Sequence, residues 1–385
     1  MRGWIICVAC VLSAAVLYAF TRTSAALVLL CVSIFVPCAS IILCRLGVSG
    51  ISVSFEVPVG LQKGAKSQCV LMIENRSVIP AAHIGMTLRV RNNLTGKEQY
   101  IPLDFAVSPR EKRELPFGFE NKYCGQFLFS CENLRVYDFL RLQSVRKTLA
   151  VQVKRLVPPE TFQIQATLLG SDVSSGLGEI FTVDRCGQDR SEPFQIRDYI
   201  KGDNVKSIHW KLSSKLDKYI VIDPSLELER NLLLIWDSGS MTSDALPEIP
   251  DALAEAFVSL CLALTGDGVP YSIAWQSVDT GDIAIKVVDV TDDIYDVIPE
   301  ILHTGTNGER HSIIPEFLQE IGMRRFPTIA YFAAQVPTEL DELAQLGRVT
   351  VFLCSQDGGA VEDDANRYEI FSPANYVSIL RNVTI

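Results

Sequence analysis

The chain has 385 residues, of which 48% are hydrophobic and 21% charged, and its formal net charge is −10. This composition excludes a disordered or collagen-like chain, and the length allows two folded domains of roughly 150 residues with further segments. Three of the 35 basic residues lie in residues 1–50, so 32 basic and 45 acidic residues remain elsewhere. Because an acidic portion without a basic stripe repels phosphate backbones, we expect no nucleic-acid partner.

Residues 1–46 are predicted to form a transmembrane hairpin in the lipid bilayer. Two uncharged apolar runs, Trp4–Phe20 and Ser24–Cys44, each approach the roughly 20 residues that a helix needs to cross the hydrocarbon core. A secretory signal peptide is the alternative interpretation of the first run, but a second apolar run follows where a cleavage region would lie. Pro37 in the second run is expected to be tolerated as a kink.

The flanking charges predict the side of the membrane on which the rest of the chain lies. Arg2 and Arg45 lie at one end of the hairpin and Arg22 at the other, so the positive-inside rule predicts residues 46–385 in the cytoplasm, below a two-pass cell-membrane anchor. The six cysteines after residue 50 are scattered, which favours reduced and mostly buried thiols. These are Cys69, Cys124, Cys131, Cys186, Cys261 and Cys354.

Residues 47–158 alternate between apolar and polar side chains in short runs. About seven runs separated by Gly, Asn and Pro predict an antiparallel, Ig-like β-sandwich, although the disulfide and central tryptophan of an immunoglobulin domain are missing. The runs are Ile51–Val57, Cys69–Asn75, Met86–Val90, Leu115–Phe119, Gln126–Phe129, Leu134–Tyr137 and Leu149–Val153.

Residues 159–230 are predicted to be a linker that also carries the densest cluster of charged and aromatic side chains. Pro158 and Pro159 end the sandwich. The Gly- and Ser-rich stretch that follows at 170–178 is interpreted as a mobile loop, and a docking arm is the alternative. In the cluster, Gly202 can end a strand and Asp203 can cap a following helix. A structural wedge, a binding surface and a catalytic role for His209 are the alternatives for this segment.

Residues 231–385 change to alternating buried strands and amphipathic helices. This pattern predicts a doubly wound α/β sheet, in which ligands bind beyond the carboxyl ends of the strands. The strands are expected at Leu232–Trp236, Tyr271–Trp275, Ile283–Val288, Thr328–Phe332 and Val349–Leu353, and the helices around Leu253–Leu264, Ile294–Leu302, Ile313–Ile321 and Glu339–Leu346.

The cluster in the linker resembles the signature of the family called domain of unknown function 58. The matching residues are Arg197, Asp198, Tyr199, Gly202, Asp203, Lys206, Ile208, His209, Trp210, Lys211 and Ser213. Lys206 stands where an arginine is more usual in the family, and Lys215 stands where Ala-Arg is often nearby. The resemblance implies a transmembrane hairpin, a β-rich domain, this signature and a von Willebrand factor A-like domain, with a MoxR-type AAA+ ATPase as partner. No catalytic residue carries over from it.

Von Willebrand A-like domains can bind Mg²⁺ through Asp-x-Ser-x-Ser after the first strand, since oxygen ligands suit this ion. Here the sequence is Asp237-Ser238-Gly239-Ser240-Met241, so two serines of the motif are replaced. Asp237 and Ser240 are therefore degenerate candidates for metal ligands, and a capping role for Asp237 is the alternative. We expect no metal and no other cofactor.

The leading functional hypothesis is a non-catalytic, membrane-anchored adaptor or scaffold that partners an AAA+ ATPase in protein assembly or maturation. The first alternative is a metal-dependent or hydrolytic enzyme that uses Asp203, His209 or Asp237, although no GxGxxG, Walker A, GxSxG or HExxH motif occurs. The second is a protein that binds an envelope component through the sandwich, which requires the opposite membrane topology.

Overall fold

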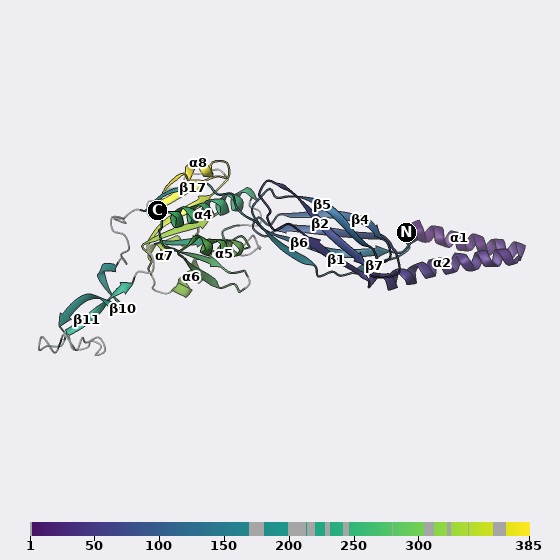
Figure 1. Cartoon of the computed structure of the whole chain (residues 1–385), viewed down its shortest axis with the longest axis horizontal. Helices are drawn as coiled ribbons and strands as arrows, with labels where there is room; N and C mark the ends of the chain where they lie inside the picture. Colours follow the sequence, from purple (N-terminus) through teal and green to yellow (C-terminus); the bar gives the residue numbers. More distant parts are fainter. Residues whose placement is uncertain are drawn as a thin grey trace. The chain divides into compact units, whose positions relative to one another are not determined.

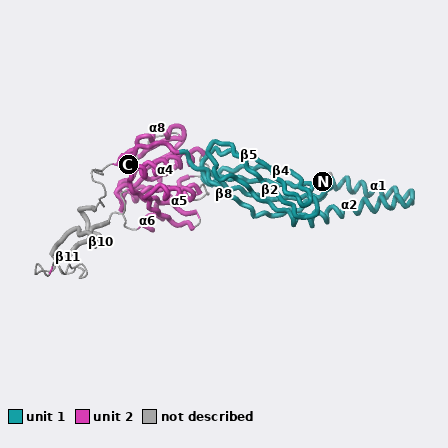
Figure 2. The backbone as a smooth tube through the Cα atoms, viewed as in Figure 1, with its two compact units in different colours: residues 1–160 teal, residues 161–385 magenta. Residues whose placement is uncertain are grey.

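The computed structural model divides the chain into two compact units, Met1–Glu160 and Thr161–Ile385 (Figure 2). Each unit is considered by itself. The described residues are 2–168, 181–198, 213, 220–227, 232–241, 246–278, 280–303, 312–321, 325–337, 339–356 and 367–385.

The first unit begins with the predicted helical hairpin. Helix α1 (Arg2–Thr21) packs against α2 (Ser24–Val48), and both are long and apolar enough to cross a membrane (Figure 1). The Thr23 hydroxyl caps α2 by accepting a hydrogen bond of 3.4 Å from the Ala26 amide. Pro37 is accommodated inside α2, as expected. Most side chains of both helices are exposed, which is the arrangement of a membrane-embedded hairpin.

Two antiparallel sheets follow, and their architecture is the predicted Ig-like sandwich. One sheet has the order β1-β2-β5, and the other has the order β4-β3-β6-β7 with β8 also paired to β6. The strands are β1 (Ile51–Glu56), β2 (Lys66–Asn75), β3 (Ala81–Asn92), β4 (Glu98–Val107), β5 (Lys112–Glu120), β6 (Gly125–Tyr137), β7 (Ser144–Lys147) and β8 (Gln152–Val157).

Inward-facing residues of the two sheets form the sandwich core. The Phe119 ring meets the Phe127 and Phe129 rings edge to face, at centroid distances of 4.8 and 5.2 Å. Two predictions of strand position were wrong. The runs at 126–129 and 134–137 are one continuous strand, β6, and residues 149–151 lie between β7 and β8.

The second unit contains a six-stranded sheet of order β14-β13-β12-β15-β16-β17. All neighbours are parallel except β13 and β14, which are antiparallel, so the sheet is mixed. Its strands are β12 (Leu232–Trp236), β13 (Tyr271–Gln276), β14 (Ile283–Val288), β15 (Thr328–Ala333), β16 (Arg348–Cys354) and β17 (Arg367–Phe371). Its larger helices are α4 (Glu248–Gly266), α5 (Thr291–Ile301), α6 (Ile314–Ile321) and α7 (Leu340–Ala344).

Alternation along β12 directs side chains to the two faces of this sheet. Leu233 and Ile235 share a core cluster with residues of α6 and α7. Trp236 faces the other way and meets Phe257 of α4 at a ring distance of 5.3 Å. Helix α4 is as long and apolar as a membrane span, but most of its residues are buried, and it packs against the opposite face of the sheet from α6 and α7.

Shorter elements complete the second unit. Strand β9 (Gln165–Thr167) pairs in parallel with β18 (Asn382–Thr384), and the short helix α8 (Tyr376–Ile379) lies next to α4. The Tyr376 hydroxyl donates a hydrogen bond of 2.5 Å to buried Glu255 of α4. Strands β10 (Phe181–Asp198) and β11 (Ile220–Glu227) form a separate antiparallel pair.

Candidate functional site at the carboxyl edge of the α/β sheet

The topology of the second unit points to one edge of its sheet. The chain leaves β12 through α4 to β13 on one side, whereas β15 pairs with β12 on the other side. The carboxyl ends of β12 and β15 therefore flank a topological switch point, where α/β proteins usually bind ligands. Asp237 follows β12 directly at this point.

Asp237 is completely buried, and its carboxylate is surrounded by hydrogen-bond donors of the same unit. One oxygen accepts from the Gly239 and Ser240 amides, at 2.9 and 3.3 Å. The other accepts from the Tyr331 hydroxyl of β15. The Ser312 hydroxyl lies 3.3 Å from the same Tyr331 oxygen, so the loop after β12, strand β15 and the residue before α6 meet around one carboxylate.

Burial is the main influence on the ionisation of this cluster. It raises the pKa of Asp237 to about 6, against the opposing hydrogen bonds from Tyr331 and backbone amides. Burial, followed by the nearby Asp237 charge, also raises the pKa of Tyr331 well above its ordinary value. Tyr331 therefore keeps its proton and acts as the donor to Asp237.

Ser240 links the ends of the two central strands. Its hydroxyl donates a hydrogen bond of 2.8 Å to the Asp237 carbonyl and accepts one of 3.0 Å from the Ala334 amide. The Asp237 amide in turn donates to the Phe332 carbonyl at 3.0 Å. The loop after β12 is thus held against the end of β15 by side-chain and backbone bonds.

This arrangement does not fit the degenerate Mg²⁺ site that the motif suggests. Both Asp237 oxygens already accept hydrogen bonds from N–H and O–H groups, whose positive ends oppose a cation at the same position. Ser240 uses its hydroxyl in the strand link. Across the described residues, no group of three or more His, Cys, Asp and Glu side chains is arranged to hold a metal ion.

The signature residues can be placed only in part. Arg197 and Asp198 end β10, where their backbones pair with Val221 and Ile220 of β11. Ser213 is buried. The remaining predicted signature residues lie outside the described part of the chain: Tyr199, Gly202, Asp203, Lys206, Ile208, His209, Trp210 and Lys211.

Two residues of the Asp237 cluster, Tyr331 and Ser312, were not predicted from the sequence. A tyrosine inside an otherwise apolar buried strand is a usable signal, since its hydroxyl requires a partner. Ser312 precedes α6 and carries no comparable signal. All five cysteines placed after residue 50 are buried thiols, and their burial agrees with the prediction. These are Cys69, Cys124, Cys131, Cys261 and Cys354.

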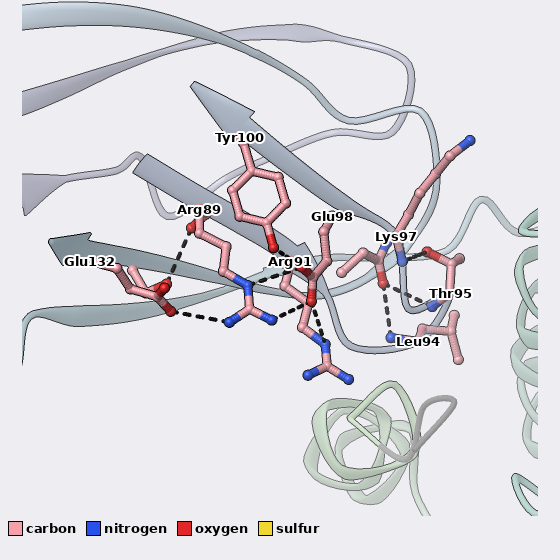
Figure 3. Close-up of polar contacts among 10 residues, drawn as sticks. Arg89, Arg91, Leu94, Thr95, Lys97, Glu98, Tyr100 and Glu132 are labelled. Carbon is pink, nitrogen blue, oxygen red and sulfur yellow. Dashed lines mark hydrogen bonds and ion pairs between the residues drawn. The ribbon is translucent and has the colours of Figure 1, made fainter. Parts of the chain in front are cut away.

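A second polar cluster lies on the sandwich, across strands β4, β3 and β6 (Figure 3). The Arg89 guanidinium contacts both Glu98 oxygens, one of them at 3.1 Å, and reaches Glu132 at 3.1 Å. The Tyr100 hydroxyl donates to Glu98 at 2.5 Å, and Arg91 lies 3.8 Å from the same carboxylate. Because these contacts join neighbouring strands and the charges balance, the cluster has a structural role.

The hydrogen bonds in this cluster shift its pKa values in the stabilising direction. The bonds from Arg89, and next from Tyr100, hold the pKa of Glu98 below its usual value. The bonds to Glu98 and Glu132 raise the pKa of Arg89 further. Glu98 is therefore ionised throughout the neutral range.

No protein-family model matches the chain, and a search of curated proteins finds no match either. Among solved structures, the CARDB domain of the PF1109 protein of Pyrococcus furiosus, in complex with di-metal ions, is 14% identical. The match covers 28% of this chain and 91% of that one, with a TM-score of 0.22. The C-terminal domain of wzt is 10% identical, with 29% and 75% covered and a TM-score of 0.23.

A longer match is a cycloisomaltooligosaccharide glucanotransferase of Paenibacillus. It covers 79% of this chain and 45% of that one at 8% identity, with a TM-score of 0.19. At TM-scores below 0.5, these likenesses support no conclusion about this chain. The family membership suggested by the signature stays a prediction.

Proposed function

We propose that this protein is a non-catalytic, membrane-anchored adaptor whose α/β unit binds a MoxR-type AAA+ ATPase during the assembly or maturation of other proteins. The apolar hairpin supplies the anchor. The single observation that carries the binding role is the edge strand β14: it presents exposed apolar side chains, and no described strand pairs with its outer side.

Strand β14 ends the described sheet on its β13 side, and within the described residues no strand pairs with its outer edge. Ile285 and Val287 are 38% and 41% exposed on this strand. Lys286 between them is held by Asp296 at 3.1 Å and by the Asp293 carbonyl at 3.2 Å. An exposed edge with alternating apolar side chains favours pairing with a strand of another protein.

The identity of the partner rests on the signature resemblance. In this proposal, the second unit is the von Willebrand factor A-like domain of the family. The sandwich and the second unit lie in the cytoplasm, where an ATPase has access to ATP. The hydrogen bonds around Asp237 hold the loop after β12 against β15, which supports a structural rather than a catalytic role for Asp237.

The proposal is tested by affinity capture of the full-length chain from detergent-solubilised membranes of its own cells. We expect an AAA+ ATPase with the wild-type chain and its loss when Ile285→Lys and Val287→Lys are combined. The matched control is Val377→Lys, which charges another exposed apolar residue, on α8. Capture without any ATPase contradicts the partner, and undiminished capture with the double variant contradicts the β14 surface.

A metal-dependent or hydrolytic enzyme is the second candidate, and one observation favours it. A buried carboxylate with a raised pKa at a topological switch point is a common feature of active sites. The test is to assay the purified chain against hydrolase substrates with and without Mg²⁺. Turnover that disappears in Asp237→Asn or His209→Gln would support the enzyme and contradict the adaptor.

The cytoplasmic location also separates the adaptor from an envelope-binding protein. Cys69 and Cys124 are completely buried, so they are poor targets for a thiol reagent. Val59 is 83% exposed, so Val59→Cys provides a better site in the sandwich unit. We expect this variant to gain labelling over the parent chain only after cells are permeabilised. Labelling in intact cells would place the sandwich outside and favour the envelope alternative.

A further inference from the structure

An apolar groove lies between the membrane helix α2 and the adjoining end of the sandwich. Its cavity volume is about 290 Å³, and its walls include Phe35, Ala39 and Leu43 of α2. Ala82 at the start of β3 and Phe139 after β6 line the opposite side. This size is at the lower end of the range for small ligand pockets, roughly 300–1,000 Å³.

Hydrogen bonds fix the loop after β6, which forms one wall of the groove, to helix α2. The Ser40 hydroxyl of α2 donates to the Asp138 carboxylate at 3.1 Å and accepts from the Phe139 amide at 3.1 Å. Asp138 also accepts from the Leu140 and Gln143 amides, at 3.2 and 2.6 Å. The loop between β6 and β7 is therefore fixed to the helix, and these polar groups satisfy one another.

Two aromatic side chains beside the groove remain exposed. Phe35 is 71% exposed on α2, and Phe139 is 74% exposed on the fixed loop. Leu140, the next loop residue, is 39% exposed. Because α2 has the length and composition of a membrane span, an apolar groove along this helix is suited to an occupant from the hydrocarbon phase.

Cationic side chains lie at the same end of the unit. Arg45 is on α2 between the groove residues Cys44 and Gly47, and it is exposed. Arg141 follows Phe139 by two residues, and its guanidinium lies 3.0 Å from the His83 ring nitrogen Nδ1. Basic residues next to a membrane helix attract lipid phosphates.

We propose that this groove binds one acyl chain of a membrane phospholipid, with the lipid phosphate at the level of Arg45 and Arg141. The acyl chain lies between α2 and the sandwich and covers the apolar side chains that line the groove on both sides. This site is independent of the partner proposed for the second unit.

The test uses full-length protein in liposomes containing a phosphatidylglycerol with a photoreactive diazirine in one acyl chain. After illumination, peptide mass spectrometry locates the labelled residues. We expect label in the sandwich segments 79–82 or 136–139 as well as in α1 and α2. Label confined to the two helices overturns the proposal, because an acyl chain in the groove contacts the sandwich wall as well as α2.

Variants that fill the groove provide the matched comparison. Ala39→Trp narrows the groove from the side of α2, and Ala82→Trp narrows it from the side of the sandwich. If one of the two variants does not fold, the other still tests the proposal. Each is expected to lose the sandwich label. Ile42→Trp makes the same change on a residue of α2 that is 57% exposed and does not line the groove. We expect it to keep the label, and equal labelling of folded groove and control variants overturns the proposal.

Discussion

The Lys147 ammonium donates a hydrogen bond of 3.2 Å to the carbonyl of Val48, the last residue of α2. It also donates to the carbonyls of Ser49 and Ile51, at 3.1 and 2.6 Å. Carbonyls at the end of a helix lack intrahelical partners and carry a partial negative charge. One lysine of β7 therefore satisfies the backbone where the membrane hairpin becomes the sandwich.

Replacing this lysine should loosen the junction. We expect Lys147→Met to lower the free energy of unfolding of the first unit by about 2 kcal/mol, since it removes charge-assisted hydrogen bonds to three carbonyls. Hydrogen exchange at residues 48–51 should also accelerate. Arg146→Met is the control, because Arg146 is the neighbouring exposed residue of β7. Equal effects of both substitutions would refute the role of Lys147.

Gly50 allows a close approach of the backbone at the same junction. A Cβ at this position would lie 2.8 Å from the Ser77 amide nitrogen and 2.9 Å from the Ser77 Cβ. We expect Gly50→Ala to cost about 1–3 kcal/mol, because overpacking forces the backbone to shift. Gly60→Ala is the control, since nothing lies within 4 Å of its Cβ position. Thermal unfolding of both variants in the same detergent measures the difference, and equal midpoints would contradict this account.

Asp237 should make the second unit less stable as the pH rises. Its folded pKa of about 6 exceeds the unfolded value of roughly 3.9, so the folded state binds more protons between these two values. Stability is therefore highest below about pH 4 and falls until about pH 6, by an amount on the order of 3 kcal/mol. We expect Asp237→Asn to abolish this decline, because the amide has no charge to desolvate.

The measurement is denaturant unfolding followed by tryptophan fluorescence from pH 4 to pH 7. Trp236 and Trp275 lie in the core of the second unit and report its unfolding. Asp267→Asn changes an exposed aspartate after α4 and serves as the control. A decline that persists in Asp237→Asn but disappears in the control would show that another group causes it.

Ser240 offers a separate test of the link between β12 and β15. We expect Ser240→Ala to cost about 1–2 kcal/mol, because it leaves the Ala334 amide without its acceptor in a partly buried loop. Ser277→Ala, at the end of the neighbouring strand β13, is the control. Hydrogen exchange of the Ala334 amide is the most direct readout, and unchanged protection there would contradict the link.

Periodicity predicted most of the fold because burial controls the spacing of apolar residues. Strands β12 and β15 are fully buried, as is β16 after Arg348, and their mostly apolar runs allowed their positions to be predicted closely. Strand β4 was missed because Pro102 interrupts a weak alternation. The structure tolerates this proline because β4 lies at a sheet edge, where one row of backbone donors is not needed.

The site was less predictable because its contacts join distant segments. The motif around Asp237 indicated the correct loop, but the Tyr331 hydroxyl that meets the carboxylate comes from a strand 94 residues further along the chain. Likewise, Lys147 reaches carbonyls of residues 48–51, and nothing in its local sequence indicates that. Such pairs depend on strand register and helix position, which apolar spacing leaves open.

The Arg89 and Glu98 pair should stabilise the sandwich above acidic pH. Since Arg89 lowers the folded pKa of Glu98, this contribution is present above the unfolded value of roughly 4.3 and is lost as the pH falls through the folded value. We expect Glu98→Gln to cost less than about 1 kcal/mol at pH 7, because the pair is partly exposed. The difference from wild type should vanish at low pH, whereas the exposed control Glu120→Gln should show none. A difference that persists at low pH would mean that packing, and not charge, holds these strands together.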